Sequence, residues 1–187
     1  MVQLKVLQCP SAEPDRVGDG SVKEINLQAA NIDYAPTLAV NSVLADLALI
    51  DPVGNYMGVM DRDRMTRKVE ITDGTSHTTL ISECAGRPKR WRVGRYVTGV
   101  YSPGGSWASP MNRNGLAGAT SDGSESPPGP CAINCVNNRQ VYSFHPGGAN
   151  FVFADGSVHF LEAGINIRIL ARLITRAGEE VVSDNDY

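Results

Sequence analysis

The clearest pattern of apolar and polar positions lies in residues 141–161. Three segments there are rich in apolar residues: 141–145, 149–154 and 157–161. The turn signals Pro146-Gly147-Gly148 and Asp155-Gly156 separate them. Proline presets φ and glycine accepts positive φ, and Asp-Gly is a strong hairpin signal. The pattern therefore predicts a three-stranded antiparallel meander.

Pairing His145 with Ala149, and Ala154 with Ser157, sorts the side chains of the meander by face. One face receives Val141, Phe151, Phe153, Val158 and Phe160. The other face receives Tyr142, Phe144, Val152, His159 and Leu161. Because both faces are apolar, this pairing predicts that the meander is the centre of a sheet covered on both sides.

Two further segments before the meander show regular periodicity. Residues 78–84 alternate as a half-buried strand does, and we expect them to join the meander. Residues 38–50 carry apolar positions at helical spacing, with Thr37 as a capping residue and Asp51-Pro52 as a stop. The sequence thus predicts a helix over 38–50 and a strand over 78–84.

A second helix is predicted over residues 167–177. Asn166 can cap it, and Gly178 suits the position after its end. Its buried stripe contains Ile169, Leu170, Leu173, Ile174 and Ala177. Arg168, Arg172 and Arg176 stand four apart on another face. A solvated or Glu-paired face is expected there, and a phosphate or carboxylate site is the alternative. Val181-Val182 is a candidate edge strand.

Residues 86–130 differ in composition from the rest of the chain. Basic residues cluster around Trp91 and are followed by Tyr96, Tyr101 and Trp107: Arg87, Lys89, Arg90, Arg92 and Arg95. Such interleaving can bind single-stranded nucleic acid or sugar. The net charge of −3 argues against a nucleic-acid footprint. We therefore expect a long loop insertion that wraps over the sheet and is anchored by Trp91.

The length of 187 residues and the composition suit one globular domain, residues 1–187, with a loop-rich architecture. The expected fold is α+β, an antiparallel sheet built on 141–161 and 78–84 with the helix 167–177 packed on one face. Four cysteines allow three full pairings. Their spacing, Cys131-Ala-Ile-Asn-Cys135 included, and that of the histidines predict no transition-metal site.

Several stretches resemble one bacterial family in the same order along the chain. His145, nine residues and then Asp155-Gly156 are similar to the signature of the prepilin-type, processing-associated H-x9-D-G domain family, whose function is unknown. Three more stretches resemble it: Cys9-Pro10-Ser11, the segment from Ile71 through Asp73-Gly74 to Glu83, and Leu173 to Val181.

The resemblance implies the globular head of a pilin-type or pseudopilin-like protein, similar to type II secretion pseudopilins. Such proteins begin with a prepilin leader and a long apolar helix, and they expose the globular part outside the cytoplasmic membrane. Residues 1–7 are too short and polar-flanked for such a helix. We therefore expect the soluble part of a longer, membrane-anchored protein of the periplasm or cell surface.

The carboxylates and histidine of these stretches invite a chemical interpretation. Asp73 and Glu83 suit either a cation or acid/base site, or a turn and an ion pair, and the structural role is favoured. A strand over residues 149–154 would span about 20 Å and would keep His145 away from Asp155. We expect Asp155 and Gly156 to form a tight turn and His145 to fix the preceding one. No catalytic motif and no cofactor are predicted.

The expected function is structural or interaction-based: an extracytoplasmic, pseudopilin-like subunit of a type II secretion or envelope assembly, with protein partners and no enzyme activity. One alternative is a module that binds sugar or calcium. A pocket lined with Trp91, Trp107 and carboxylates would indicate this function. The second alternative is a hydrolase with an unrecognised site. A convergent histidine–carboxylate pair would indicate this function. From export and the cysteines together, we expect a disulfide between Cys9 and either Cys131 or Cys135.

Overall fold

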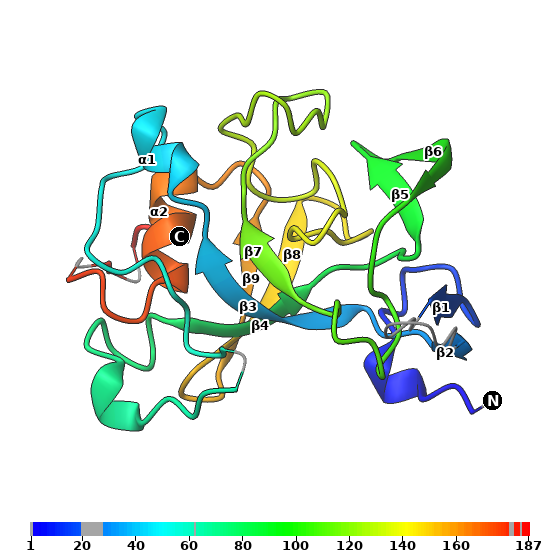
Figure 1. The fold of residues 1–187 in the computed structure, drawn as a ribbon, viewed down its shortest axis with the longest axis horizontal. Coiled ribbons are helices and arrows are strands. Elements are labelled where there is room, and N and C mark those ends of the chain that lie inside the picture. The colour runs from blue at the N-terminus through cyan, green and yellow to red at the C-terminus, as the bar shows by residue number, and fades with distance from the viewer. Residues whose placement is uncertain (1, 20–27, 62, 180–181, 184) are drawn as a thin grey trace.

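A five-stranded mixed sheet forms the centre of the molecule (Figure 1). The computed structural model describes residues 2–19, 28–61, 63–179, 182–183 and 185–187. The sheet order is β7-β3-β4-β8-β9, with β7 parallel to β3 and every other pair antiparallel. These strands are β3 (Tyr34–Val40), β4 (Thr79–Glu83), β7 (Asn114–Leu116), β8 (Gly148–Phe153) and β9 (Val158–Glu162).

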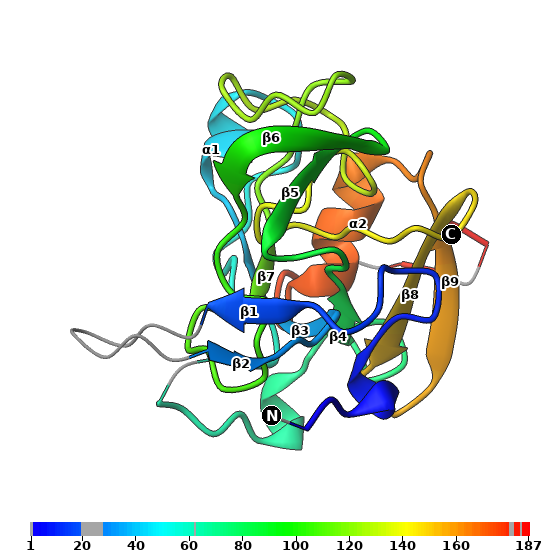
Figure 2. The same cartoon turned by 90° about the vertical axis from the view of Figure 1, so that its right-hand side faces the viewer.

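Two small two-stranded sheets and two helices surround the central sheet. The remaining elements are β1 (Val17–Asp19), β2 (Gln28–Ala30), β5 (Lys89–Arg92), β6 (Arg95–Tyr101), α1 (Val43–Asp46), α2 (Ile167–Ile174) and the 3-10 turns η1 (Lys5–Leu7) and η2 (Lys68–Glu70). Both small sheets, β1–β2 and β5–β6, lie at the right of the central sheet in Figure 1, and the helices lie at its left. Figure 2 shows β5–β6 and β1–β2 as separate ribbons.

The fold class expected from the sequence is wrong. The molecule is mostly β, its central sheet is mixed rather than antiparallel, and α2 is the one helix longer than four residues in the part of the chain that the structure describes. It is not a helix-packed α+β pilin head. Nineteen glycines and eleven prolines divide the chain into short segments, which favours strands and turns over helices that need several uninterrupted turns.

The helix expected over 38–50 is reduced to the four residues of α1, because residues 38–40 belong to β3. Thr37 does not cap a helix. It is buried in β3, where its Oγ1 lies 3.0 Å from Ser82 Oγ of β4. Pairing of β3 with β4 on one side and with β7 on the other satisfies the backbone here, so tertiary contacts outweigh the helical spacing.

The meander is present only in part. β8 pairs with β9 and with β4, as expected, but Val141 and Tyr142 form isolated parallel bridges with Ile133 and Cys84 instead of a strand beside β8. β9 is an edge strand rather than part of the sheet centre. The expected first strand of the meander fails because Phe144 to Gly147 is a turn that reverses the chain into β8.

The β8–β9 register differs by one residue from the expected one. Val152 pairs with Val158, and Phe151 pairs with His159, so four residues connect the two strands, and Gly156 among them adopts φ 91°. A slip of one residue moves every side chain of β9 to the other face. Consequently Leu161 shares the buried face with Phe151, whereas Val158 is 64% exposed.

The main core joins the buried face of β8 to α2. Asn166 caps α2 by accepting a hydrogen bond from the Arg168 backbone N–H, and the helix ends at Ile174 rather than at residue 177. The side chains that form the centre of this cluster are Leu44, Leu116, Ile133, Phe151, Phe153, Leu161, Leu170, Leu173 and Ile174. Helix α2 therefore buries one stripe, which agrees with the predicted one at Leu170, Leu173 and Ile174 only. Ile169 and Ala177 are half-buried, and Ile167 and Ala171 are buried instead.

The three arginines spaced four apart contact protein groups. Arg168 and Arg172 form ion pairs with Asp51 at 2.6 and 2.9 Å, and Arg176 donates to the Gly58 carbonyl at 2.6 Å. The Arg172 and Arg168 contacts hold the pKa of Asp51 below its usual range. The residues near the end of α2 thus connect the helix to the segment after α1. The expected edge strand at 181–182 involves position 181, which lies outside the described residues.

Residues 86–130, expected as a long loop insertion, contain β5, β6 and β7. The β5–β6 hairpin packs on the body through Trp91, whose ring meets Phe144 edge-on at 4.9 Å between centroids. β7 enters the central sheet beside β3. No helix among the described residues is long and apolar enough to cross a membrane.

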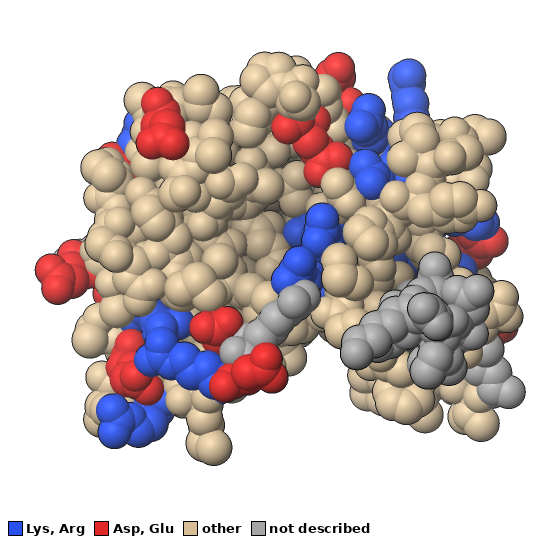
Figure 3. Space-filling view, in the orientation of Figure 1, with Lys and Arg blue, Asp and Glu red and all other residues tan. Residues whose placement is uncertain are grey.

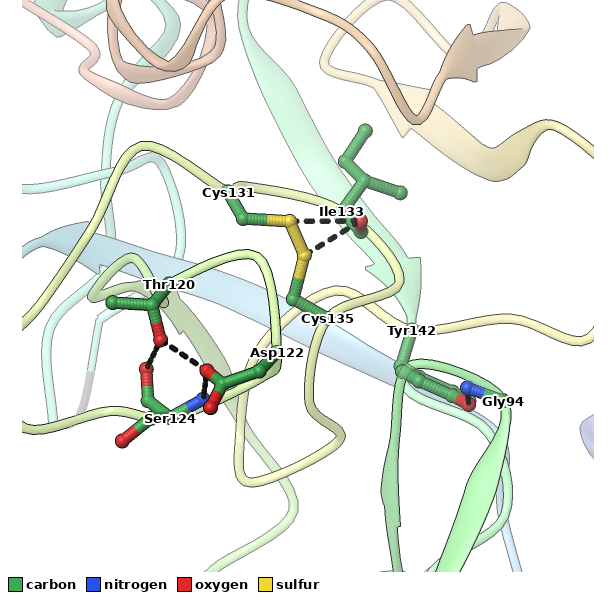
Figure 4. The surroundings of a disulfide bond; sticks show 8 residues. All are labelled: Gly94, Thr120, Asp122, Ser124, Cys131, Ile133, Cys135 and Tyr142. Carbon is green, nitrogen blue, oxygen red and sulfur yellow. Dashed lines mark hydrogen bonds between the residues drawn. A yellow bond between two sulfur atoms is a disulfide. The ribbon is translucent and has the colours of Figure 1, made fainter.

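A disulfide joins Cys131 to Cys135 (Figure 4). Cys9 and Cys84 are buried free thiols. The expected bridge between Cys9 and one of this pair is therefore wrong. The four-residue separation brings the two Cα atoms to 6.2 Å, within the range that a disulfide needs. Close to the bridge, the Val93 N–H donates to the Cys135 carbonyl and the Gly94 N–H to the Tyr142 hydroxyl.

Candidate functional site

Three side chains that could bind a metal ion converge from distant parts of the chain. Cys9 follows η1, Glu83 ends β4, and His145 lies in the turn before β8. His145 Nε2 is 3.3 Å from Cys9 Sγ and 3.1 Å from Glu83 Oε1. One ligand atom from each residue lies within 4.8 Å of the others. We refer to these three residues as the Cys9–Glu83–His145 cluster.

The polar groups of the cluster are oriented by neighbours. Glu83 is fully buried, and its Oε2 accepts hydrogen bonds from the Asn150 backbone N–H at 2.7 Å and from Asn150 Nδ2 at 3.2 Å. His145 Nδ1 is 3.2 Å from Ser11 Oγ. The side chain of His145 is 23% exposed, so the cluster has one side that faces solvent.

A second buried carboxylate, Asp33, lies next to the cluster and has a different set of partners. It receives the Cys9 N–H at 2.9 Å and the Gly86 N–H at 3.1 Å. Arg16 donates to both of its oxygens at 2.6 Å. Asp33 therefore fastens the N-terminal segment to the body and has a guanidinium as counter-ion.

The Cys9 thiol is a weak acid in this environment. Its burial is the largest cause that raises its pKa to about 11, and the negative charges of Glu83 and Asp33 add to the effect. The opposing hydrogen bond from the Ser11 backbone is smaller. Because the thiolate is the nucleophile, a thiol with this pKa is unreactive at neutral pH.

The other residues singled out by the sequence lie in turns. Asp155 Oδ1 accepts from the backbone N–H and the hydroxyl of Ser157 at 2.9 and 2.7 Å, at the far end of β8 from His145. Asp73 accepts from the backbone N–H groups of Gly178 and Glu179 at 2.7 and 3.0 Å, which connects its turn to the chain after α2. Gly74 has φ 95°, which glycine accepts without strain.

The sequence singled out Glu83 and His145 separately but did not bring them together, and it missed Cys9 and Ser11 as their neighbours. Spacing along the chain gives no sign of this convergence, since the three members of the cluster stand at positions 9, 83 and 145. The one available signal was that each of three family-like stretches contributes one polar residue. The prediction of no transition-metal site considered only histidines and cysteines that are close together in sequence. It therefore did not consider ligands that the fold brings together from distant positions.

Two grooves in the described part of the chain lie away from the cluster. One of about 440 Å³ runs along β3 and β7, and its lining contains four charged residues: Asp61, Arg113, Glu125 and Arg139. Another, of about 310 Å³, is lined by Trp107 together with Val2, Leu4, Gln28, Ala29 and Ala30. Neither combines Trp91, Trp107 and carboxylates, the lining that would indicate a module for sugar or calcium.

Comparison with known proteins gives one match. The model of a family described as a protein of unknown function, DUF1559, matches residues 2–168. No curated protein and no solved structure matches the chain. The matched region contains all three residues of the cluster and most of the described fold. The chain therefore belongs to the DUF1559 family of proteins of unknown function.

Proposed function

We propose that this protein is an exported, non-enzymatic subunit that contacts other proteins of a secretion or envelope assembly. The resemblance of its His145, Asp155 and Gly156 segment to prepilin-type proteins supports this role. The Cys131–Cys135 disulfide supports export, because disulfides persist in oxidising compartments. The high pKa of the Cys9 thiol, about 11, favours a non-enzymatic role for the candidate site.

The observation that carries the proposal is the exposed apolar surface of the β5–β6 hairpin. Tyr101 is 73% exposed, and Val93, Tyr96 and Val100 are each more than two-fifths exposed. Four large apolar side chains thus face solvent within nine residues. Several large exposed apolar side chains on one hairpin favour a contact site for another protein.

The tip of the hairpin adds an independent argument. Val93 and Gly94 form its two-residue turn with φ of 44° and 75°. Positive φ is natural for glycine but strained for a β-branched residue, and Asn-Gly is the usual pair in such a turn. An exposed valine at this position therefore costs stability, and such strain is typical of functional positions.

The geometry favours a partner that adds an extended segment to the hairpin. Among the described strands, β6 pairs only with β5, so its outer edge remains available for strand addition. Arg92 and Arg95 flank the tip, and Figure 3 shows basic side chains gathered over this hairpin. We therefore expect the partner segment to be apolar with acidic residues near its end.

The test is site-specific photo-crosslinking in the native host, with the crosslinking amino acid at position 101. We expect a discrete adduct with one envelope protein. The matched control places the same amino acid at position 65, since Met65 is 89% exposed but lies away from the hairpin in sequence. The control position should give no such adduct.

The Val93→Asn substitution separates interaction from folding. It should raise the free energy of unfolding by about 1 kcal/mol, because asparagine accepts the left-handed conformation that strains valine. The same variant should lose most of the adduct from position 101. An unchanged adduct in Val93→Asn, equal adducts from positions 65 and 101, or a chain confined to the cytoplasmic fraction would each overturn the proposal.

A further inference from the structure

The Cys9–Glu83–His145 cluster contains a fully buried carboxyl group that has no Lys or Arg partner among its described contacts. The side chain of Glu83 contacts two N–H groups of Asn150, the ring of His145 and the Cys9 thiol. Neighbouring Asp33, equally buried, is paired with Arg16. An ionised carboxylate is costly to bury unless it is paired or coordinates a metal. The two carboxylates therefore differ in what would neutralise them.

We propose that the cluster is a binding site for a divalent transition cation, Zn²⁺ in the first instance, with Cys9 Sγ, Glu83 Oε1 and His145 Nε2 as ligands. Sulfur, nitrogen and oxygen together suit zinc, whereas calcium and magnesium select oxygen alone. Binding would release the proton of the Cys9 thiol to solvent, and the resulting thiolate together with a carboxylate would neutralise the two charges of the ion.

The two distances from His145 Nε2 to the other ligand atoms fit a tetrahedral ion after a small expansion. Bond lengths of about 2.0–2.1 Å to nitrogen and oxygen and about 2.3 Å to sulfur place ligand atoms about 3.3 Å (N···O) and about 3.6 Å (N···S) apart. The present separations are 3.1 Å for Nε2···Oε1 and 3.3 Å for Nε2···Sγ. These two pairs therefore need to open by only a few tenths of an ångström, and Cys9 Sγ lies within 4.8 Å of Glu83 Oε1.

The neighbours of the three side chains have the arrangement that supports metal ligands. Ligating histidines usually hydrogen-bond through their other ring nitrogen, and ligating carboxylates through their other oxygen. His145 Nδ1 faces Ser11 Oγ, and Glu83 Oε2 receives Asn150. Without metal, Nε2–H can donate to Glu83 while Nδ1 accepts from Ser11; with metal, the proton lies on Nδ1 and Ser11 accepts it.

The site has a solvent side for entry. Cys9 and Glu83 are buried, but the partly exposed His145 side chain and the exposed Ser11 form its outer wall. Three protein ligands leave a fourth position, which water would fill from this side. The metal site is independent of the β5–β6 hairpin, so either can fail without the other.

The test uses the purified full chain with its disulfide intact and Co²⁺ as a spectroscopic substitute for Zn²⁺. We expect one equivalent of Co²⁺ to give a thiolate-to-cobalt charge-transfer band and Zn²⁺ to displace it. Cys9→Ser should abolish the band, and Glu83→Gln and His145→Gln should each weaken Zn²⁺ binding more than about 100-fold. Ser11→Ala, which leaves all ligands in place, should weaken binding about 10-fold.

Two matched controls keep the test specific. Cys84→Ala removes the other buried free thiol, and His159→Gln removes a half-buried histidine of β9; both should retain the band. Thermal melts establish which variants fold, and Ser11→Ala provides a graded readout if Glu83→Gln does not. Absence of stoichiometric binding to the wild-type chain, or a band that survives Cys9→Ser, would overturn the proposal and leave the cluster as a hydrogen-bonded junction.

Discussion

At the scale of single residues, Asp155 connects the β8–β9 turn through one carboxylate oxygen. Both hydrogen bonds to Oδ1 come from Ser157, its hydroxyl and its backbone N–H. The hydroxyl contact is the largest cause that lowers the pKa of Asp155, so the carboxylate is ionised at neutral pH. The residue therefore shapes a turn that brings two strands into register.

We predict that Asp155→Ala lowers the melting temperature by a few degrees, because the Ser157 N–H and hydroxyl lose their acceptor. Asp155→Asn retains an acceptor oxygen and should have a smaller effect. Thermal unfolding at neutral pH measures both changes. Glu162→Ala, an exposed carboxylate on β9, is the control; an equal effect of the two alanine variants would contradict the turn role.

At the scale of elements, the β8–β9 register decides which aromatic side chains form the core. Phe151 is fully buried, whereas Val158 on the partner strand is 64% exposed. We predict that Phe151→Ala destabilises the protein by about 3–5 kcal/mol, because it leaves a cavity in the main cluster. Val158→Ala should change the free energy of unfolding by less than about 0.5 kcal/mol. Chemical denaturation measures both.

The comparison between these two variants tests the register itself. In the alternative register, one residue away, Val158 would share the buried face with Phe151. A large loss from Val158→Ala would therefore support the alternative and count against the arrangement described above. Leu161→Ala serves as the reciprocal control, since Leu161 is buried only in the observed register.

Asp51 connects α2 to the segment after α1, and it makes stability depend on pH. Its pKa is lowered chiefly by the hydrogen bond from Arg172, so it stabilises the fold above the unfolded-state pKa of about 3.9 and stops doing so as the pH falls through its folded pKa. We predict that Asp51→Asn lowers stability at pH 7 by at most about 1 kcal/mol, because the pair is partly exposed.

The difference between Asp51→Asn and wild type should be smaller at pH 2 than at pH 7, because Asp51 becomes protonated as the pH falls through its lowered folded pKa. Urea unfolding at the two pH values provides the measurement. Asp46→Asn, an exposed carboxylate on α1, is the matched control and should show no comparable loss at pH 7. A difference for Asp51→Asn that persists unchanged at pH 2 would show that the ion pair is not its source.

The elements that the sequence predicted best were those marked by turn chemistry. Asp155-Gly156 and Asn166 identified the β8–β9 turn and the start of α2, because both signals act within a few residues. The periodicity over 38–50 predicted a helix that is too long. It describes the pattern of side chains alone and does not include the strand pairing of the backbone. Thr37 joins β3 through its contact with Ser82, a pairing that depends on residues far away in sequence.

At the scale of the whole molecule, the disulfide links neighbours rather than distant segments. Closing the short Cys131–Cys135 loop stabilises the protein by about 2 kcal/mol in the chain-entropy model. We predict that the double variant Cys131→Ser with Cys135→Ser loses this amount of its free energy of unfolding. Denaturant unfolding of the variant and of the oxidised wild-type protein measures the difference. Cys84→Ala is not an equivalent control because that thiol is fully buried, so the reduced wild-type chain serves instead. A loss several times larger would indicate a role beyond loop closure.

Prediction of the candidate site was limited because its residues are far apart in sequence and meet only in the folded chain. Resemblance to a family identified Glu83 and His145 as individual residues, and turn chemistry explained Asp155. The contact between Cys9 and Glu83 depends on how the N-terminal segment packs on the end of β4, with Asp33 and Arg16 holding it there. No local pattern encodes this packing, since it follows from the assembled sheet.

The segment around Cys9 is synthesised well before His145, one of the residues on which it docks. Cys9 and His145 are 136 residues apart, and a ribosome adds roughly 5 to 20 residues per second, so roughly 7 to 27 s pass between the synthesis of the two. Throughout this interval the Cys9 thiol has no burial site, while Cys84 and then Cys131 and Cys135 emerge. During synthesis the Cys9 thiol is therefore accessible to every other cysteine of the chain, although the finished fold buries it.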